Sequence, residues 1–560
     1  MRKLVLALSA VLLLGMFSKE IADSDFWWHL RTGEYIATAH RLPVPDPFAY
    51  TTAMARPAYR GEERTRYFNL THEWLAQVLL SATYRAGGFG GIVMVRAMLL
   101  AACCCVVGVI TWWRRRSFYG ALAGAFLTAS VARGFAADRP YQVTWLLLAC
   151  TIAIMEARRG MWLLPPLFLI WANCHGGYFL GWLVLGAYSA EAIFLRLRRR
   201  PDPRARELWA VSLLSILVSG VNPNGFQIIR TLADYRASFM TAHLLEWARP
   251  QLWPPSAFSM LLMGAALVLL WAQRRVRFVD WLLFIAFSSA ALMAQRNTML
   301  IGYLAPILIV TYFPWKLRLP AAAARIAPIA TALLAAAGLA AGLASGSFFQ
   351  LRAAEWRYPA GAADFLLAHG ITEPMFNTYE YGGYLIWRLA PRQRVFIDGR
   401  ALSETVFMDY ARILYNHDAS DGKSAEELLD QYGVQVIVMN TFEYANGLVY
   451  VLAPALADPQ QTTWKLVYSD AQALVFMRTP PPGVQPLDSL QVLTHMEAEC
   501  ELHITREPAL ARCSRALGQV FAKIGDRKRA RKWIAIYLDH PHAPDPEAEQ
   551  AYQQLVGFGQ

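Results

Sequence analysis

The sequence IADSDFWWHLRTGEYI occupies residues 21–36 and follows a long apolar segment that begins at Leu4. It combines Asp23, Asp25 and Glu34 with an arginine, a histidine and two adjacent tryptophans. Aromatic and charged side chains gather where a membrane helix meets water. The stretch therefore marks the end of a first membrane helix and the start of a polar loop.

The composition agrees with a membrane protein. Of the 560 residues, 56% are hydrophobic and 17% are charged, and the mean hydropathy is +0.28. Such values are typical of a polytopic membrane protein. The net charge of +12 comes from short clusters beside apolar segments, without a continuous basic domain. We therefore expect the lipid bilayer as a partner and exclude nucleic acid.

Apolar segments of roughly 17 to 25 residues predict membrane helices. About eleven segments fit this description: 4–22, 91–113, 117–134, 141–157, 161–174, 178–195, 206–221, 256–273, 278–294, 298–315 and 326–346. Basic clusters fall on every second connection: Arg2–Lys3, Arg114–Arg116, Arg158–Arg159, Arg196–Arg200, Arg274–Arg277 and Lys316–Arg318. Because such clusters stay cytoplasmic, the N-terminus is predicted inside and the C-terminus outside.

The first segment has an alternative interpretation as a cleaved signal peptide, since Met1-Arg2-Lys3 precedes an apolar run that ends at Phe17. No clear small-x-small cleavage site precedes Asp23, so we favour a membrane helix.

Of seven cysteines, Cys500 and Cys513 lie in the predicted outer part of the chain. An oxidising compartment permits a disulfide between them, and two free thiols are the alternative.

Unusual polar residues collect on the predicted outer connections. The first connection, residues 23–90, also contains NLTHEWLAQVLL at 69–80. The singled-out residues are Asp23, Asp25, Trp27, Trp28, His29, His72, Glu73, Arg133, Asp138, Arg139, His175 and Arg296. An ionised side chain at the bilayer centre costs roughly 2.5–3.5 kcal/mol, so these charges are predicted to face one wet cavity beside the lipid.

Each group of these polar and aromatic residues also has a simpler interpretation. The tryptophans fit an interfacial aromatic belt, the histidines fit ordinary interfacial positions, and Arg133 and Arg139 fit contacts with lipid phosphates. These interpretations explain poorly why carboxylates and arginines gather on one side only.

The segment IADSDFWWHLRTGEYI after a first membrane helix, the long loop behind it and about a dozen helices resemble the GT-C class of membrane glycosyltransferases. The resemblance covers roughly the first 345 residues. DFWWHLRTGEYI, THEWLAQVLL and YEYGGYLIWRLAPRQRVFIDGR are also similar to a group of bacterial membrane proteins with this layout, which brings no assigned reaction. The resemblance implies a bacterial inner membrane location and a sugar donor linked to polyprenyl phosphate.

The resemblance also implies roles for the polar residues. Transfer from such a donor needs a base for the acceptor and cations for the departing phosphate. Asp25 is the expected base and Asp23 its alternative, with Glu73 and Asp138 as further acids. The expected phosphate-binding residues are Arg139, Arg296 and Arg133, and the expected substrate-binding residues are Trp27, Trp28, His29, His72, His175, Asp398 and Arg400. Asp23-Ser24-Asp25 departs from the adjacent acids common in the class, and Asp138-Arg139 is a partial match to its second acidic motif.

A metal is a further expectation, although no spacing is diagnostic. Oxygen and nitrogen ligands for Mg²⁺ or Mn²⁺ are available from Asp25, His29, His72, Glu73 and Asp138. No other cofactor is predicted.

The composition changes after residue 346. We predict a GT-C-like membrane domain at 1–346, a periplasmic α/β domain at 347–480 and a helical, tetratricopeptide-like tail at 487–560, joined by the stiff linker RTPPPGVQP. Strands are predicted at RVFIDG, VQVIVMN, LVYVLA and WKLVYSDAQALVFMR. Asp398 and Arg400 end the first of these and help to select the acceptor, or else they form a structural turn and salt bridge.

The leading interpretation is an inverting glycosyltransferase that moves a sugar from a polyprenyl phosphate to a glycan, lipid or protein on the periplasmic face. One alternative is a transporter or assembly scaffold with a periplasmic protein partner. Transporters usually bind substrate near the bilayer midplane within repeated halves, and no internal repeat is evident here. Another alternative is a lipid-linked glycan ligase or polymerase.

Overall fold

The computed structural model describes residues 1–240, 244–314, 321–415, 422–444, 446–508 and 511–557. The chain forms two compact units. Unit 1 contains Met1–Val44 and Tyr59–Ala353, and unit 2 contains Pro45–Ala58 and Ala354–Gln560. A short piece of the predicted first loop therefore belongs to the same unit as the C-terminal half of the chain.

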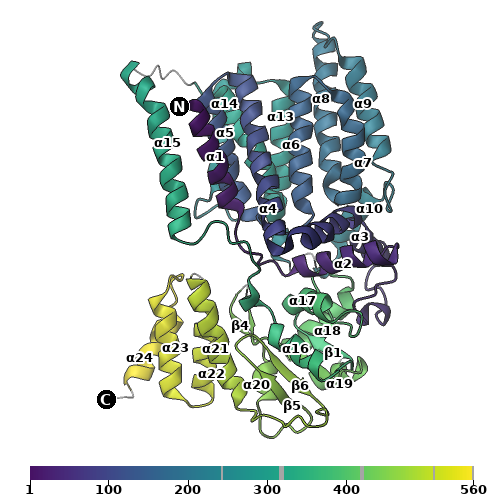
Figure 1. Cartoon of the computed structure of the whole chain (residues 1–560), viewed down its shortest axis with the longest axis vertical. Helices are drawn as coiled ribbons and strands as arrows, with labels where there is room; N and C mark the ends of the chain where they lie inside the picture. Colours follow the sequence, from purple (N-terminus) through teal and green to yellow (C-terminus); the bar gives the residue numbers. More distant parts are fainter. Residues whose placement is uncertain (241–243, 315–320, 416–421, 445, 509–510, 558–560) are drawn as a thin grey trace. The chain divides into compact units, whose positions relative to one another are not determined.

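Unit 1 is helical, and Figure 1 shows most of its helices side by side, with α2 and α3 lying crosswise at one end. Its α-helices are α1 (Arg2–Phe17), α2 (Asp25–Ala39), α3 (Glu62–Thr71), α4 (Trp74–Arg115), α5 (Phe118–Ala132), α6 (Tyr141–Ala157), α7 (Leu164–Cys174), α8 (Phe179–Leu197), α9 (Ala205–Val218), α10 (Ile228–Asp234), α12 (Ala257–Ala272), α13 (Phe278–Met293), α14 (Met299–Tyr312) and α15 (Ala321–Ala344). Each apolar segment predicted to cross the membrane overlaps one of these helices.

Four helical segments of the described residues are long and apolar enough to cross a membrane: Glu62–Arg115, Gly176–Leu197, Ala257–Arg275 and Arg325–Ala344. Shorter apolar helices lie at Tyr141–Ala157, Met161–Cys174 and Phe278–Met293. The total of eleven crossings stays a prediction. Within Glu62–Arg115, Gly88 has φ 57° and ψ −154°, a conformation that L-residues avoid. It separates a short helix from the long apolar one.

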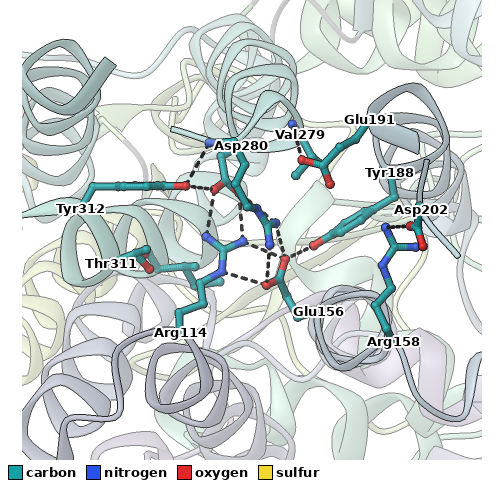
Figure 2. A network of polar contacts seen from close by, with 12 residues as sticks. Arg114, Glu156, Arg158, Tyr188, Glu191, Asp202, Val279, Asp280, Thr311 and Tyr312 are labelled. Atoms are coloured by element: carbon teal, nitrogen blue, oxygen red, sulfur yellow. Dashed lines mark hydrogen bonds and ion pairs between the residues drawn. The ribbon is translucent and has the colours of Figure 1, made fainter. Parts of the chain in front are cut away.

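A buried network of ion pairs joins several helices of unit 1 (Figure 2). Arg114 Nη2 lies 2.7 Å from Glu156 Oε1 and 2.9 Å from Asp280 Oδ1. Arg277 Nη2 lies 2.6 Å from the same Glu156 oxygen, and Tyr312 donates to Asp280 at 2.6 Å. Two of the arginines that the sequence marks as cytoplasmic therefore make internal ion pairs. The basic cluster Lys316–Arg318 lies outside the described residues.

Unit 2 contains a four-stranded sheet in the order β1-β2-β6-β5. Its strands are β1 (Met375–Asn377), β2 (Val436–Met439), β5 (Lys465–Ser469) and β6 (Leu474–Met477), and a separate pair is β3 (Phe442–Glu443) with β4 (Leu448–Val449). β1 pairs with β2 in parallel, and the other pairs are antiparallel. The strands of the central pair, β2 and β6, are buried along their whole length, as their apolar sequences require. The accompanying helices are α16 (Ala360–Ala368), α17 (Tyr379–Leu389), α18 (Glu404–Tyr415), α19 (Ala425–Gln431) and α20 (Leu452–Leu456).

One of the predicted strands is wrong, and another is shorter than predicted. RVFIDG makes only an isolated bridge, between Val395 and Ala49. The side chain of Asn377 accepts from the Phe396 N–H at 2.8 Å and donates to the Ile397 carbonyl at 2.8 Å, so these backbone groups need no neighbouring strand. LVYVLA continues as a strand only to residue 449 and then enters α20.

The C-terminal helices are α21 (Gln491–Arg506), α22 (Arg512–Lys523), α23 (Arg527–Asp539) and α24 (Pro546–Gly557). Cys500 and Cys513 form a disulfide that joins α21 to α22, which settles the two alternatives in favour of the bond. A Cβ atom on Gly518 would lie 2.6 Å from the Ile534 side chain. The glycine therefore allows α22 and α23 to approach closely.

Candidate functional site

Helix α2 carries the acidic motif and is held tightly against the start of α4. The carboxylate of Asp23 accepts from the Asp25 N–H at 3.0 Å, which satisfies one of the free N–H groups at the start of the helix. A Cβ atom on Gly33 would lie 1.9 Å from the Gln77 carbonyl oxygen. No other residue fits there without moving the backbone, so α2 has a fixed position within unit 1.

Arg139 joins the two aspartates. Its guanidinium donates to Asp23 Oδ1 at 2.9 Å and lies 2.8 Å from Asp25 Oδ2. Burial raises the pKa of Asp25 to about 6, with a further rise from the charge of Asp23, against the opposing effect of Arg139. Burial also acts to raise the pKa of Asp23, but its two contacts with Arg139 outweigh this and lower it. The pair therefore contains one strongly ionised carboxylate and one that takes up a proton near neutral pH.

A third carboxylate, Glu246, lies between two arginines. It is 3.6 Å from Arg139 and 3.1 Å from Arg296, and the Arg296 guanidinium lies 4.7 Å from the ring centre of Trp247. The Glu246 side chain is 41% exposed, more than either arginine. An exposed carboxylate between two guanidinium groups occupies the place where an anion from solution would bind.

Three histidines surround Glu73. His72 Nε2 lies 3.3 Å from Glu73 Oε1, and His175 Nε2 lies 3.6 Å from the same oxygen. His29 Nδ1 lies 3.6 Å from the other oxygen, Oε2. Burial lowers the pKa of His29 to about 4, so His29 is neutral at ordinary pH. His72, Glu73 and His175 form a group of potential metal ligands, whose ligand atoms lie within 4.8 Å of one another.

Asp138 lies in a buried ion pair with Arg96 of α4. Arg96 also donates to the backbone carbonyls of Phe17 and Lys19 at the end of α1. Asp138 is only 3% exposed and Arg96 only 2%. A carboxylate that is enclosed and paired in this way serves to hold α1, α4 and the α5–α6 connection together.

Of the remaining predicted site residues, Trp28 interacts with the Asp25 carboxyl group, and the others do not join these clusters. Trp27 and Trp28 are 1% and 6% exposed, so they pack inside the protein and do not form an aromatic belt in lipid. Arg133 is exposed in a short 3-10 turn. In unit 2, Arg400 lies 2.7 Å from Asp398 and 2.7 Å from Asp46, in the salt bridge that the structural interpretation predicts.

Comparison with known proteins adds the fold class. No protein-family model matches the sequence, and no curated protein is similar to it in sequence. Its structure is similar to the archaeal oligosaccharyltransferase AglB from Archaeoglobus fulgidus in complex with an inhibitory peptide and a dolichol-phosphate, with a TM-score of 0.54 over 96% of this chain and 86% of that chain. The apo crystal structure of an oligosaccharyltransferase from the same organism gives a TM-score of 0.53 over 89% and 78% of the two chains. The sequence identity is 12% in both cases.

The chain has the GT-C fold. At this identity the likeness establishes the fold alone. Sequence reasoning missed two partners of the predicted residues: Arg96, which pairs with Asp138, and Glu246, which lies between Arg139 and Arg296. Arg96 had a usable signal, because a single arginine within the apolar segment 91–113 needs a partner. Glu246 had none, since nothing in the sequence places it beside Arg139.

Proposed function

We propose that the protein is an integral-membrane glycosyltransferase that transfers a sugar from a polyprenyl-phosphate-linked donor to a glycan, lipid or protein acceptor. The observation that carries this proposal is the arrangement of Asp25, Arg139, Glu246 and Arg296 at one end of a GT-C fold. It provides a carboxylate with a pKa near neutrality beside a pair of cations. The AglB structure contains a dolichol-phosphate, which supports a lipid-linked donor.

In the proposed reaction, Asp25 accepts the proton of the acceptor hydroxyl or amide as the new bond to the sugar carbon forms. The bond between that carbon and the phosphate oxygen breaks, and the phosphate leaves with the electron pair. A single displacement of this kind inverts the configuration of the sugar. A base whose pKa lies near the working pH is effective in such a step.

The donor phosphate takes the place of the Glu246 carboxylate between Arg139 and Arg296. Guanidinium groups bind phosphate through paired N–H donors, and both arginines already point toward one anionic group. Because Glu246 is the most exposed member of this cluster, it can move away as the donor arrives. Asp23 remains on Arg139 and keeps the guanidinium in position.

The proposed orientation places this site on the periplasmic face of a bacterial inner membrane, with the N-terminus in the cytoplasm. The support is the alternation of basic clusters along the sequence, because Arg114–Arg116 and Arg158–Arg159 follow helices that start at the site and end away from it. Reporter fusions after Arg116 and after Val44 test the orientation. A periplasmic signal after Arg116 would reverse it.

Purified protein and a radiolabelled polyprenyl-phosphate sugar test the reaction. Asp25→Asn should lower the rate by about 10²- to 10⁴-fold, the usual contribution of a general base. Glu34→Gln, a change of a more exposed carboxylate on the same helix, is the matched control. Glu246→Gln should tighten donor binding, because it removes the competing charge. Wild-type transfer by Asp25→Asn would refute the assigned base, and weaker donor binding by Glu246→Gln would refute the phosphate position.

A further inference from the structure

The side chains of His72, Glu73 and His175 lie at two helix junctions of unit 1. His72 and Glu73 connect α3 to α4, and His175 connects α7 to α8. One ligand atom from each of these side chains lies within 4.8 Å of the other two, and Glu73 is only 8% exposed. Of the other predicted metal ligands, Asp25 is paired with Arg139 and Asp138 with Arg96, and His29 lies near the second oxygen of Glu73. The predicted ligand set therefore does not converge on one place, and His175 joins His72 and Glu73 instead.

The hydrogen bonds of His72 fix its tautomer. Its Nδ1 atom lies 2.7 Å from the Phe68 carbonyl oxygen, and because a carbonyl can only accept, Nδ1 carries the hydrogen. The neutral ring then directs the lone pair of Nε2 toward the Glu73 carboxylate, 3.3 Å away. Two acceptors facing each other in a buried place repel unless a cation or a proton lies between them. The ring cannot turn easily, since it is stacked on Phe68 with centroids 4.2 Å apart.

His175 is oriented by contacts of its Nδ1 atom. Nδ1 lies 2.8 Å from the Thr144 hydroxyl and accepts from the Gly177 N–H at 2.9 Å, and Trp171 fixes that hydroxyl by donating to it at 2.8 Å. Binding of a cation by Nε2 requires the hydrogen on Nδ1, where it is donated to the Thr144 hydroxyl in place of the Gly177 contact. Metal-binding histidines commonly donate their second ring N–H to a fixed oxygen of this kind.

The two distances from histidine nitrogen to carboxylate oxygen match a transition metal. In a tetrahedral site with bonds of about 2.0–2.2 Å, neighbouring ligand atoms are about 3.3–3.6 Å apart. The two nitrogen-to-Oε1 distances are 3.3 and 3.6 Å, which is long for hydrogen bonds but right for two ligands of one ion. Two imidazoles and one carboxylate suit Zn²⁺, whereas Mg²⁺ prefers oxygen ligands.

We infer that His72, Glu73 and His175 bind a zinc-class divalent cation that fastens the α3–α4 junction to the α7–α8 junction. Three protein ligands leave one position of a tetrahedral ion open to water or to a substrate oxygen. This assignment is independent of the proposed transfer reaction, because it concerns binding of the ion and does not require catalysis.

The test measures metal directly on the purified full-length protein. After treatment with a chelator and addition of Zn²⁺ alone, wild type should hold about one Zn²⁺ per chain by elemental analysis. His72→Asn and His175→Asn should each weaken Zn²⁺ binding at least about tenfold, as loss of a ligand exceeds the usual loss from an outer partner. His40→Asn is the matched control, because His40 is an exposed histidine at the end of α2 and outside the ligand group, so its loss should leave zinc binding unchanged. Replacement by Co²⁺ should give the visible absorption of a tetrahedral site in wild type and in the control.

Two results would overturn the inference. One is a wild-type protein that binds no Zn²⁺ and whose unfolding temperature does not change on its addition, which would show that His72 and Glu73 form a protonated histidine–carboxylate pair. The other is zinc binding that survives in both histidine variants but is lost in Asp25→Asn. Thermal unfolding of each variant without metal separates loss of the site from failure to fold.

Discussion

Asp25 offers a pH-dependent test at the scale of a single residue. Its pKa is raised to about 6 by burial and by the charge of Asp23, and the proposed base works only when deprotonated. The transfer rate should therefore rise with pH up to an inflection near 6. In Asp23→Asn the inflection should move to lower pH, because the neighbouring negative charge is gone. The measurement is the rate as a function of pH, and Glu34→Gln should keep the wild-type profile.

Arg96 and Asp138 make a second prediction for individual residues. Removing one partner of a buried ion pair leaves the other charge uncompensated and costs about 3–5 kcal/mol. Arg96→Met should therefore lower the unfolding temperature sharply, whereas Arg96→Met combined with Asp138→Asn should recover much of the loss. Thermal unfolding in detergent measures both. If the double variant is as unstable as the sum of the two single variants, the pair is not a unit.

At the scale of helices, the network around Glu156 joins α4, α6 and α13 (Figure 2). Glu156 contacts Arg114 and Arg277 and accepts from the Tyr188 hydroxyl. Glu156→Ala leaves the buried Arg114 and the partly exposed Arg277 to share Asp280, so we expect a loss of about 3 kcal/mol in the free energy of unfolding, the lower end of the cost of breaking a buried ion pair.

The control for this prediction is Arg196→Gln, a change of an exposed arginine at the end of α8. It should alter stability by less than about 0.5 kcal/mol, as most surface substitutions do. Chemical unfolding followed by tryptophan fluorescence compares the two variants. Equal stability of Glu156→Ala and Arg196→Gln would show that the network contributes nothing to the fold.

The sequence predicts helices well because an apolar segment of membrane length has few other ways to satisfy its backbone. It predicts short strands poorly. β1 has three residues, which are too few to show an alternation of apolar and polar side chains. The sequence around Phe396 predicts a strand, but the Phe396 N–H donates its hydrogen bond to the side chain of Asn377 and not to the backbone of a neighbouring strand. For the site, the sequence correctly predicts that Asp23, Asp25 and Arg139 lie on the same side of the membrane domain, because consecutive connections alternate between the two membrane faces. It does not give the pairings, which depend on how the helices pack.

At the scale of the whole molecule, two separate segments of the chain belong to unit 2. Residues 45–58 leave the first loop and contribute Asp46 to a buried contact with Arg400. Asp46 also accepts from the Thr52 hydroxyl at 3.1 Å and from the Phe48 N–H at 3.0 Å. The sequence predicts one continuous loop over 23–90, because the composition does not change at residues 45–58. Its function is to add a structural segment to unit 2 from a distant part of the chain.

The final prediction follows from this double connection. Asp46→Asn in the full-length protein should destabilise unit 2 by about 3–5 kcal/mol, because the side chain of Arg400 is only 2% exposed and loses half of its charge compensation. Hydrogen exchange should then become faster in β1 and in α17 while the helices of unit 1 keep their protection. Asp430→Asn is the matched control, since it breaks an aspartate–arginine pair whose carboxylate is 61% exposed and should cost no more than about 1 kcal/mol. If both variants exchange like wild type, residues 45–58 only rest on unit 2, and the Asp46–Arg400 contact does not stabilise it.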